Sequence, residues 1–283
     1  ASPVFTGNVG VGVTPESWSS GYKALQVGGT GSIASSNTAA AGSDTHYGQN
    51  IYLNTSGAWA YQVTDQASLM SQNDGQFRFR VAPSGTADAA ISWTTAMTID
   101  NSGKVLVGQT SQNLSAEGIS ISPLGYIQVT EADSPTLYLN RLTSGGDIVR
   151  FYKDGTVVGS IGVNASATSF NTSSDYRLKE NVTPMSGATA QTKLLKPCNF
   201  DWKTVGGNVN GFLAHELAEV VPEAVSGTKD AMKDEEYEVT AAVLDDEGNE
   251  TTAAVMGTRS VPDMQGIDQS KLVPLLTATI QEL

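Results

Sequence analysis

The sequence predicts a mainly β N-terminal region, followed by a smaller α+β domain with a long β-hairpin arm and a C-terminal helix. Residues 1–173 hold most of the Gly, Ser, Thr and Asn, and their apolar residues alternate with polar ones in short runs. From about residue 174 charged residues become denser and apolar residues recur at helical spacings. Period-two runs between turn residues are typical of antiparallel strands, and spacings of three and four are typical of helices. We therefore expect two domains, 1–173 and 174–283, which a chain of this length allows.

Strand and turn signals alternate through the N-terminal region. In residues 77–81 phenylalanine and valine alternate with arginine, and in 137–139 two leucines flank a tyrosine, so both segments are expected to be strands. The triplets Asn-Ser-Gly at 101–103 and Lys-Asp-Gly at 153–155 lie between such runs. Because Asn, Asp and Gly accept the positive φ angles of tight turns, these triplets predict hairpin loops.

The N-terminal region also repeats itself. Residues 7–14 align with 103–110 after a small shift, 25–33 with 119–127, and 51–54 with 137–140. We expect two divergent copies of one β module, at about 1–100 and 101–173. A small β unit rich in glycine buries little apolar area per residue, so packing against further copies is a natural way to stabilise it. The repeat therefore predicts an oligomer of interdigitated chains.

Strand and helix signals follow one another after residue 174. The segment 199–202 is strand-like, and a stripe of apolar residues at spacings of three and four predicts a short amphipathic helix that stops near Pro222. The members of that stripe are Ala214, Leu217, Ala218 and Val221. The β-prone segments 237–244 and 251–258 are joined by the acidic run 245–249, so they predict a long hairpin with an acidic tip.

The last residues predict a helix that starts a coiled coil. Leu272, Leu276, Ile280 and Leu283 recur at spacings of four, four and three. Such a stripe packs against the same stripe on other helices, so it again indicates several chains. The pattern is still running where the sequence stops, and the chain begins at Ala1 rather than Met, so we expect both ends to belong to a longer protein.

Charge and rare residues exclude several classes of function. The net charge of -13 opposes binding to nucleic acid, because counterion release needs clustered Lys and Arg. The single cysteine, Cys198, excludes a disulfide within the chain and is expected to be a small buried residue. With only His46 and His215 beside it, a Cys/His zinc cluster is excluded, so neither a metal nor a cofactor is expected. No apolar run approaches the roughly 20 residues of a membrane span, so membrane insertion is not expected either.

A serine and a lysine five residues apart mark the junction between the two predicted domains. A serine hydroxyl needs a partner that takes its proton, and a lysine can do this when burial or nearby cations lower its pKa. Ser174 and Lys179 are such a pair, but residues five apart on a regular helix differ by about 140° and do not meet. They would need a loop that leads into a helix, or a lysine from a neighbouring subunit. The alternative is that Ser174 caps a short helix, with Asp175 in its first turn, and that Lys179 is a solvated charge.

The residues around this pair resemble a known family. Residues 174–182, Ser-Asp-Tyr-Arg-Leu-Lys-Glu-Asn-Val, are similar to the entry motif of the intramolecular chaperone auto-processing domain, which is found at the C termini of bacteriophage tail spikes, tail fibres and endosialidases. Three later motifs follow in the family's order, at 200–203, 211–225 and 271–276. The resemblance covers about residues 173–283. One departure is His215, where the family commonly has Gln, and we interpret it as a polar residue near the helix surface.

The resemblance implies a folding aid that removes itself. Three copies of the domain would assemble the preceding β region into a homotrimer, after which each chain would be cut once between Ser173 and Ser174. The Ser174 hydroxyl would attack the Ser173 carbonyl and form an ester by an N-to-O acyl shift, and water would hydrolyse the ester. Lys179 would act as the base and then protonate the leaving amine. Asp175 and Arg177 match the motif and would orient the turn or the subunit contacts.

The N-terminal region resembles modules that precede this domain in tail fibres, best over residues 134–163. The resemblance implies a trimeric shaft or tip in the virion tail, made in the host cytoplasm. It would contact a host cell-surface receptor, with glycans among the candidates, and would join other tail proteins through residues that precede this sequence. Four aromatic residues could stack on sugar rings, although aromatic residues in strands more often fill cores. They are Tyr47, Trp59, Tyr61 and Trp93.

Two other functions stay open from the sequence. One is a structural fibre whose chaperone stays attached and uncleaved. The other is a glycan-degrading tail spike, an enzyme that usually needs a pair of clustered carboxylates. Residues 1–173 hold 11 acidic residues with no obvious clustered pair. The sequence therefore favours the fibre, with a single-turnover serine autoprotease at the Ser174–Lys179 pair.

Overall fold

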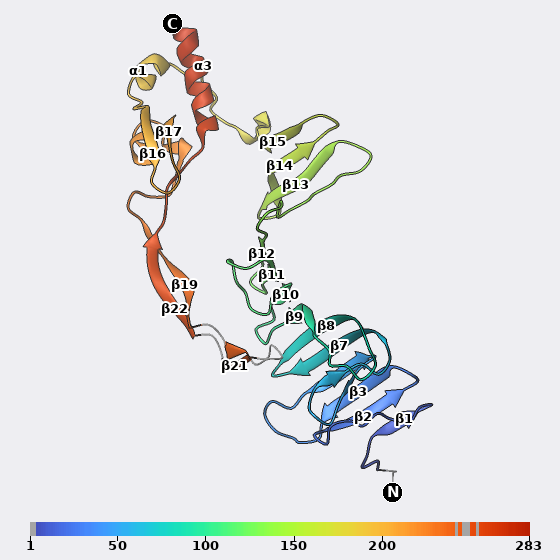
Figure 1. The fold of residues 1–283 in the computed structure, drawn as a ribbon. Helices are drawn as coiled ribbons and strands as arrows, with labels where there is room; N and C mark the ends of the chain where they lie inside the picture. Colours follow the sequence, from blue (N-terminus) through green and yellow to red (C-terminus); the bar gives the residue numbers. More distant parts are fainter. Residues whose placement is uncertain (1–3, 241–242, 245–249, 253–254) are drawn as a thin grey trace. The chain divides into compact units, whose positions relative to one another are not determined.

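A computed structural model describes residues 4–240, 243–244, 250–252 and 255–283 (Figure 1). The chain forms two compact units, Ala1–Ser144 and Gly145–Leu283. Strands supply most of the regular structure, and all helices of the described residues lie in the second unit. The predicted fold class, a mainly β region followed by a smaller part with helices, is confirmed.

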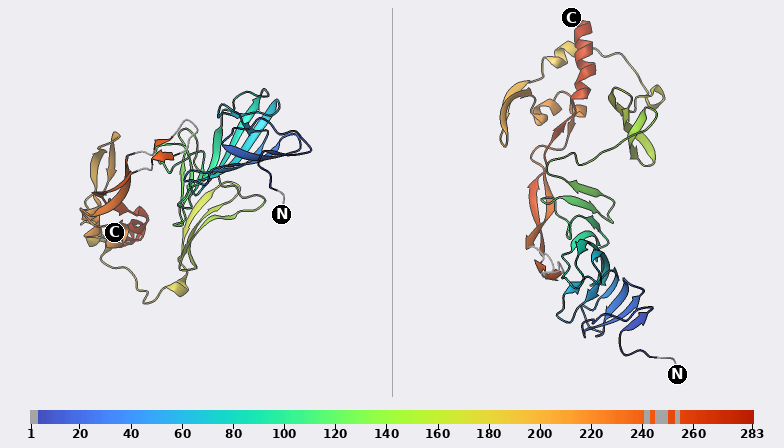
Figure 2. Two further views of the ribbon diagram at one scale, coloured as in Figure 1. Left: turned by 90° about the horizontal axis from the view of Figure 1, so that it is seen from below. Right: turned by 45° about the vertical axis from the view of Figure 1, so that its right-hand side comes forward.

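The first unit is built on one ten-stranded sheet of order β1-β2-β3-β4-β7-β8-β9-β10-β11-β12 (Figure 1). Neighbouring strands are antiparallel except for the parallel pair of β1 and β2. Figure 2 shows these strands side by side in two further views. The strands are β1 (Val9–Val11), β2 (Tyr22–Val27), β3 (Gly31–Ser36), β4 (Thr45–Gln49), β7 (Asp65–Asn73), β8 (Gln76–Gly85), β9 (Thr94–Ile99), β10 (Val105–Val107), β11 (Gly118–Ile121) and β12 (Ile127–Thr130). A separate ribbon pairs β5 (Tyr52–Leu53) with β6 (Trp59–Ala60).

One face of this sheet is covered by aromatic side chains from the same unit. Trp18 and Trp59 meet edge to face with ring centroids 6.4 Å apart, and both are buried. They belong to one apolar core with Ala24 of β2 and Ala34 of β3. Small residues on the strands leave room for the large rings that pack against them.

The four aromatic residues considered for sugar stacking have different surroundings. Trp59 and Tyr61 are buried in the core, and Trp93 is partly buried against it. Core packing therefore accounts for these three rings. Tyr47 lies on β4 and is 41% exposed.

Both predicted hairpin loops form. The Asp100 carboxylate accepts hydrogen bonds at 2.9 Å from the N–H groups of Ser102 and Lys104, in the turn between β9 and β10. In the second loop Asp154 and Gly155 have φ angles of 48° and 78°. Two successive positive φ angles give the turn whose twist fits a two-residue hairpin, which is why Asp-Gly signalled it in the sequence.

The second unit begins with a three-stranded antiparallel sheet of β13 (Gly146–Lys153), β14 (Thr156–Val163) and β15 (Thr168–Thr172). A 3-10 helix, η1 (Tyr176–Leu178), follows β15. The remaining elements are α1 (Ala188–Thr192), β16 (Cys198–Trp202), β17 (Gly206–Gly211), α2 (Ala214–Ala218), η2 (Pro222–Ala224), β18 (Val225–Ser226), β19 (Met232–Thr240), β20 (Val243–Leu244), β21 (Glu250–Thr252), β22 (Val255–Pro262), β23 (Gly266–Ile267), η3 (Gln269–Lys271) and α3 (Leu272–Glu282).

The helices of the second unit share a small apolar core. Leu275 of α3 is 3% exposed and belongs to one cluster with Ala188 of α1 and Leu217 of α2. The first turn of α1 has no cap from its own residues, and the Glu282 carboxylate accepts the N–H groups of Thr189 and Ala188 at 2.7 and 2.9 Å instead. These hydrogen bonds hold the pKa of Glu282 below its usual value. The end of α3 is thereby fixed to the beginning of α1.

The predicted hairpin arm is present and longer than the sequence indicated. β19 pairs antiparallel with β22 from Met232 opposite Pro262 to Thr240 opposite Val255. β20 pairs with β21 farther along the same hairpin. The predicted acidic tip, residues 245–249, lies outside the described residues.

Two predictions about single elements were wrong. The segment 137–140 forms no strand, and Leu137 and Tyr138 are exposed. An alternating run becomes a strand only where a neighbour takes up its hydrogen bonds, and the described residues offer this segment none. The second wrong prediction placed Leu272 in the exposed apolar stripe of α3. Leu272 is buried in the helical core, and Val273 is the exposed residue at the start of that stripe.

The proposed repeat shows both agreement and difference at the level of strands. β11 and β12 form a hairpin, as β2 and β3 do. β10 pairs antiparallel with β11, whereas β1 pairs parallel with β2. The division into two copies stays a prediction.

Candidate functional site

The predicted cleavage site lies directly after a strand. Ser173 follows β15, and its N–H donates to the Val158 carbonyl at 3.2 Å. Its hydroxyl donates to the Val157 carbonyl at 3.4 Å. The residue on the N-terminal side of the Ser173–Ser174 bond is therefore held by β14, a contact that nothing in the sequence pattern indicated.

The residue after Ser174 organises the other side of the bond. Asp175 is the N-cap of η1, and its carboxylate accepts the Arg177 N–H at 2.9 Å. The same carboxylate also accepts hydrogen bonds from Nε and Nη2 of the Arg177 guanidinium, at 2.9 and 2.8 Å. This two-point contact with Arg177, together with the N–H bond, holds the pKa of Asp175 below its usual value. Local hydrogen bonds thus fix the turn in which the predicted nucleophile sits.

Ser174 and Lys179 meet within one chain. Lys179 Nζ donates a hydrogen bond to Ser174 Oγ at 2.7 Å. The two residues flank η1 rather than lie on it, because Ser174 precedes the cap and Lys179 follows the last turn with extended angles, φ -123° and ψ 142°. The expected loop that leads into a helix is present, so no second subunit is needed for the contact. The cap is Asp175, so the alternative in which Ser174 caps the helix is wrong.

Both reactive candidates lie in the open on the single chain. Residues 173–179 are all exposed. A lysine that serves as a base must be neutral when it takes the serine proton. The geometry therefore brings a nucleophile and a base together, and the chemistry also needs something that removes Lys179 from water.

The other rare residues lie elsewhere in the second unit. Cys198 is half-buried on β16, and its thiol donates to the Gly211 carbonyl at 3.6 Å. His215 is half-buried on α2. Within the part of the chain that the structure describes, no three His, Cys, Asp or Glu side chains gather as metal ligands would. None of the described helices has both the length and the apolar character needed to cross a membrane.

The described residues form a β-rich chain with an exposed Ser/Lys contact between β15 and α1 of the second unit. Residues 174–226 match the family described as the chaperone of endosialidase. The match begins at Ser174, the first residue of the motif. The resemblance inferred from the sequence motifs is confirmed over this segment.

Comparison with whole proteins adds one similar structure. No curated protein matches the chain. Among solved structures, the chain is similar to the C-terminal domain of the bacteriophage T5 L-shaped tail fibre with its intramolecular chaperone domain, at 16% identity and a TM-score of 0.26. The alignment covers 95% of this chain and 57% of that one, so the present chain spans little more than half the length of the fibre fragment.

Proposed function

We propose that the chain belongs to a phage tail fibre or receptor-binding protein whose residues 174–283 drive homotrimer folding and then release residues 1–173. The observation that carries this proposal is the 2.7 Å contact between Lys179 Nζ and Ser174 Oγ at the first residue of the chaperone match. The match supports the folding role, and the contact supports a self-cleaving role at the Ser173–Ser174 bond.

The reaction begins with proton transfer from Ser174 to neutral Lys179. Ser174 Oγ then attacks the carbonyl carbon of Ser173, and the five-membered ring that forms carries an oxyanion. When the ring opens, the C–N bond breaks, Lys179 returns its proton to the Ser174 nitrogen, and an ester joins Ser173 to the Ser174 side chain. Water adds to the ester carbon and the C–O bond breaks. The products are a carboxylate on Ser173 and a free amine and hydroxyl on Ser174.

The local structure supports a reaction of this kind. β14 holds Ser173, and the Asp175–Arg177 contact fixes the turn on the other side of the bond. Positioning a nucleophile and its target in this way contributes several kcal/mol to a reaction, of the order of 7–11 in the best intramolecular cases. Cleavage leaves the sheet of β13, β14 and β15 on the upstream product.

Trimer formation supplies the missing condition for the base. Lys179 is exposed on the single chain, and a lysine acts as a base where contacts remove it from water. Packing of three chains covers Lys179 and so makes cleavage follow assembly. A chaperone that waits for the trimer before it leaves is the functional consequence.

The released β region acts in the virion tail. It contacts a receptor on the host cell surface, with glycans among the candidates, and joins other tail proteins through residues that precede this sequence. Tyr47, at 41%, is the most exposed of the four rings considered.

A denaturing gel of the purified full chain tests the cleavage. The unmodified chain is expected to give two fragments that divide after residue 173. Ser174→Ala and Lys179→Ala are expected to stay intact, because one lacks the nucleophile and the other the base. Lys203→Ala is a matched control that should be cut like the unmodified chain, since its exposed side chain takes no part in the reaction.

A permanently attached chaperone is the outcome that would overturn the cleavage proposal. In that case the unmodified chain shows one intact band after prolonged incubation as a trimer. Release of reducing ends from host polysaccharide would instead identify a glycan-degrading tail spike. A monomeric mass in solution at working concentration would count against every version of the fibre proposal.

A further inference from the structure

The uncovered face of the ten-stranded sheet carries a row of apolar side chains that crosses every strand. Directly paired residues form this row through the whole register. It starts at Val9 on β1, passes Ile33, Tyr47, Met70 and Phe79 on the central strands and Val107 on β10, and ends at Val129 on β12. Paired residues in a sheet point to the same side, so the row lies on one face. We call it the apolar ladder.

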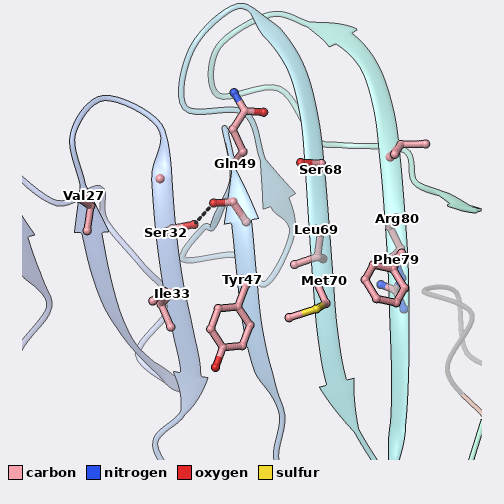
Figure 3. Close-up of a pocket in the computed structure, with 13 residues that line it drawn as sticks. Val27, Ser32, Ile33, Tyr47, Gln49, Ser68, Leu69, Met70, Phe79 and Arg80 are labelled. Carbon is pink, nitrogen blue, oxygen red and sulfur yellow. Dashed lines mark hydrogen bonds between the residues drawn. The ribbon is translucent and has the colours of Figure 1, made fainter. Parts of the chain in front are cut away.

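The ladder is left open by its own chain. None of its ten residues is buried, and Ile33 and Tyr47 are 42% and 41% exposed. Figure 3 shows Ile33, Tyr47, Met70 and Phe79 side by side across the strands, where they line a shallow groove of about 580 Å³. On the opposite face of the same strands, polar residues such as Gln26 and Ser32 are buried. The sheet thus shows its more apolar side outward.

The size of this face fits a stable protein interface. The ten strands are separated by nine spacings of about 4.8 Å, which gives a length of roughly 43 Å. The ladder and the row of paired residues on each side of it lie about 7 Å apart, which gives a width of roughly 20 Å. Its area, roughly 850 Å², matches one side of a standard protein interface, with the apolar ladder along its middle row. A single small ligand would leave most of it uncovered.

The distribution of charge favours another copy of the chain as the partner. The chain carries a net charge of -13, so chains repel each other wherever charged surfaces meet. The ladder holds no charged residue, and the paired residues on either side of it hold one, Lys23 on β2, while Glu117 and Glu131 lie just beyond the ends of β11 and β12. A glycan or polar receptor needs directed hydrogen-bonding groups, and the ladder offers one such side-chain group, the Tyr47 hydroxyl. From β1 to β9, like faces can therefore meet without like charges.

We propose that the apolar ladder is the surface by which three copies of the first unit pack around a common axis. The proposal rests on the homotrimer proposed above and assigns its contact surface in the β region. About a three-fold axis each ladder residue meets its own counterparts, so an apolar residue meets apolar residues at every level. The homotrimer is then held by a surface that stays with the fibre after the chaperone is cut away.

Single cysteines in the full chain test this placement. With Cys198→Ser as the background, Ile33→Cys and Val107→Cys put a thiol on the ladder at two separate strands, and Leu124→Cys puts one in the exposed turn between β11 and β12. Mild oxidation or a short thiol-to-thiol cross-linker should give a dimer band from both ladder variants. Thiols close to a three-fold axis lie within reach of each other, whereas those of Leu124→Cys point into solvent and should give none.

The outcomes separate this inference from the function on which it rests. A Cys198→Ser parent that is monomeric by mass would overturn the trimer itself. If that parent is a trimer but the ladder thiols neither cross-link nor resist a soluble maleimide, the ladder is open in the trimer and the inference fails. That second result would leave the face to a receptor. Protection of both ladder thiols together with cross-linking, beside an unprotected Leu124→Cys, is the expected result.

Discussion

At the scale of single residues, the site depends on hydrogen bonds that lie between neighbours in the sequence. The motif predicted that Ser174 and Lys179 act together, but their spacing gave no geometry. The contact exists because the N-cap carboxylate of Asp175 starts a one-turn helix and because Lys179 leaves that turn with extended angles. A cap residue next to a serine is a readable signal. The hydrogen bonds from Ser173 to β14 had no such signal, because they join residues 15 and 16 positions apart in the sequence.

The role of Asp175 can be tested by two substitutions. Asp175→Asn keeps an oxygen that caps η1 but loses the ionic contact with Arg177, whereas Asp175→Ala loses both. We expect cleavage to slow modestly in the first variant and about tenfold to a hundredfold in the second, as misplacement of a reacting group does. Rates from a denaturing-gel time course measure this, with the exposed carboxylate variant Asp201→Asn as the control. Cleavage of Asp175→Ala at the unmodified rate would contradict the positioning role.

The pH dependence of the same turn follows from the sign of the shift. The pKa of Asp175 is lowered from 3.8 by its bonds to Arg177. A carboxylate whose pKa is lower in the folded state stabilises the turn at pH values above its pKa in the unfolded chain. That stabilisation is lost as the pH falls through its pKa in the folded state. The turn should therefore be complete at neutral pH.

At the scale of elements, sequence patterns identified strands better than they identified faces. The alternation in 77–81 correctly predicted a strand, β8. The usual expectation is that the phenylalanines face the core and the arginines face solvent, yet Phe77 is 40% exposed and Arg78 is buried. Alternation fixes only that the two sets lie on opposite faces, and what covers each face is decided by segments far along the chain or by other chains. The wrong strand prediction at 137–140 has the same cause, because an alternating pattern does not show which strand, if any, would pair with it.

The contact of α1 with α3 is a second feature that the sequence did not reveal, and it can be tested by its energy. Leu275→Ala removes a side chain that is 3% exposed between the helices and is expected to cost about 2–5 kcal/mol of unfolding free energy. Leu194→Ala makes the same chemical change at a 63% exposed position and should cost less than about 0.5 kcal/mol. Hydrogen exchange of the amides in α1 and α3 measures both. Equal protection in the two variants would show that α3 does not hold α1.

At the scale of the whole molecule, each unit leaves an apolar surface open among its described residues. The first is the apolar ladder. The second is an outward stripe on α3, formed by Val273, Leu276, Ile280 and Leu283 at spacings of three, four and three. This is the spacing of a coiled-coil seam. The stripe predicted from the sequence began at Leu272, which is buried, whereas the exposed stripe begins at Val273. In a sequence pattern, a contact with another chain shows itself as apolar residues on the face of an element that its own chain leaves exposed.

The stripe on α3 allows a test of whether assembly controls cleavage. Ile280→Glu puts a charge on the seam of each helix, so three chains would bring three carboxylates together, and we expect trimer formation to fall. Ile280 is outside the core that Leu275 occupies, so the fold of the single chain and its contact between Ser174 and Lys179 should remain. If packing of three chains is what removes Lys179 from water, cleavage falls with the trimer. Gln281→Glu adds the same charge one position off the seam and should leave both unchanged.

Mass in solution and a cleavage time course, taken on the same samples, decide the matter. A monomeric Ile280→Glu chain that still cuts itself at the unmodified rate would show that the exposed Ser/Lys contact is sufficient alone, and assembly would then have no part in timing. Loss of cleavage in step with loss of trimer, and recovery of both at high protein concentration, requires that the base becomes active only in the trimer. Concentration is the sharper variable, because a reaction confined to one chain has a half-life that dilution does not change.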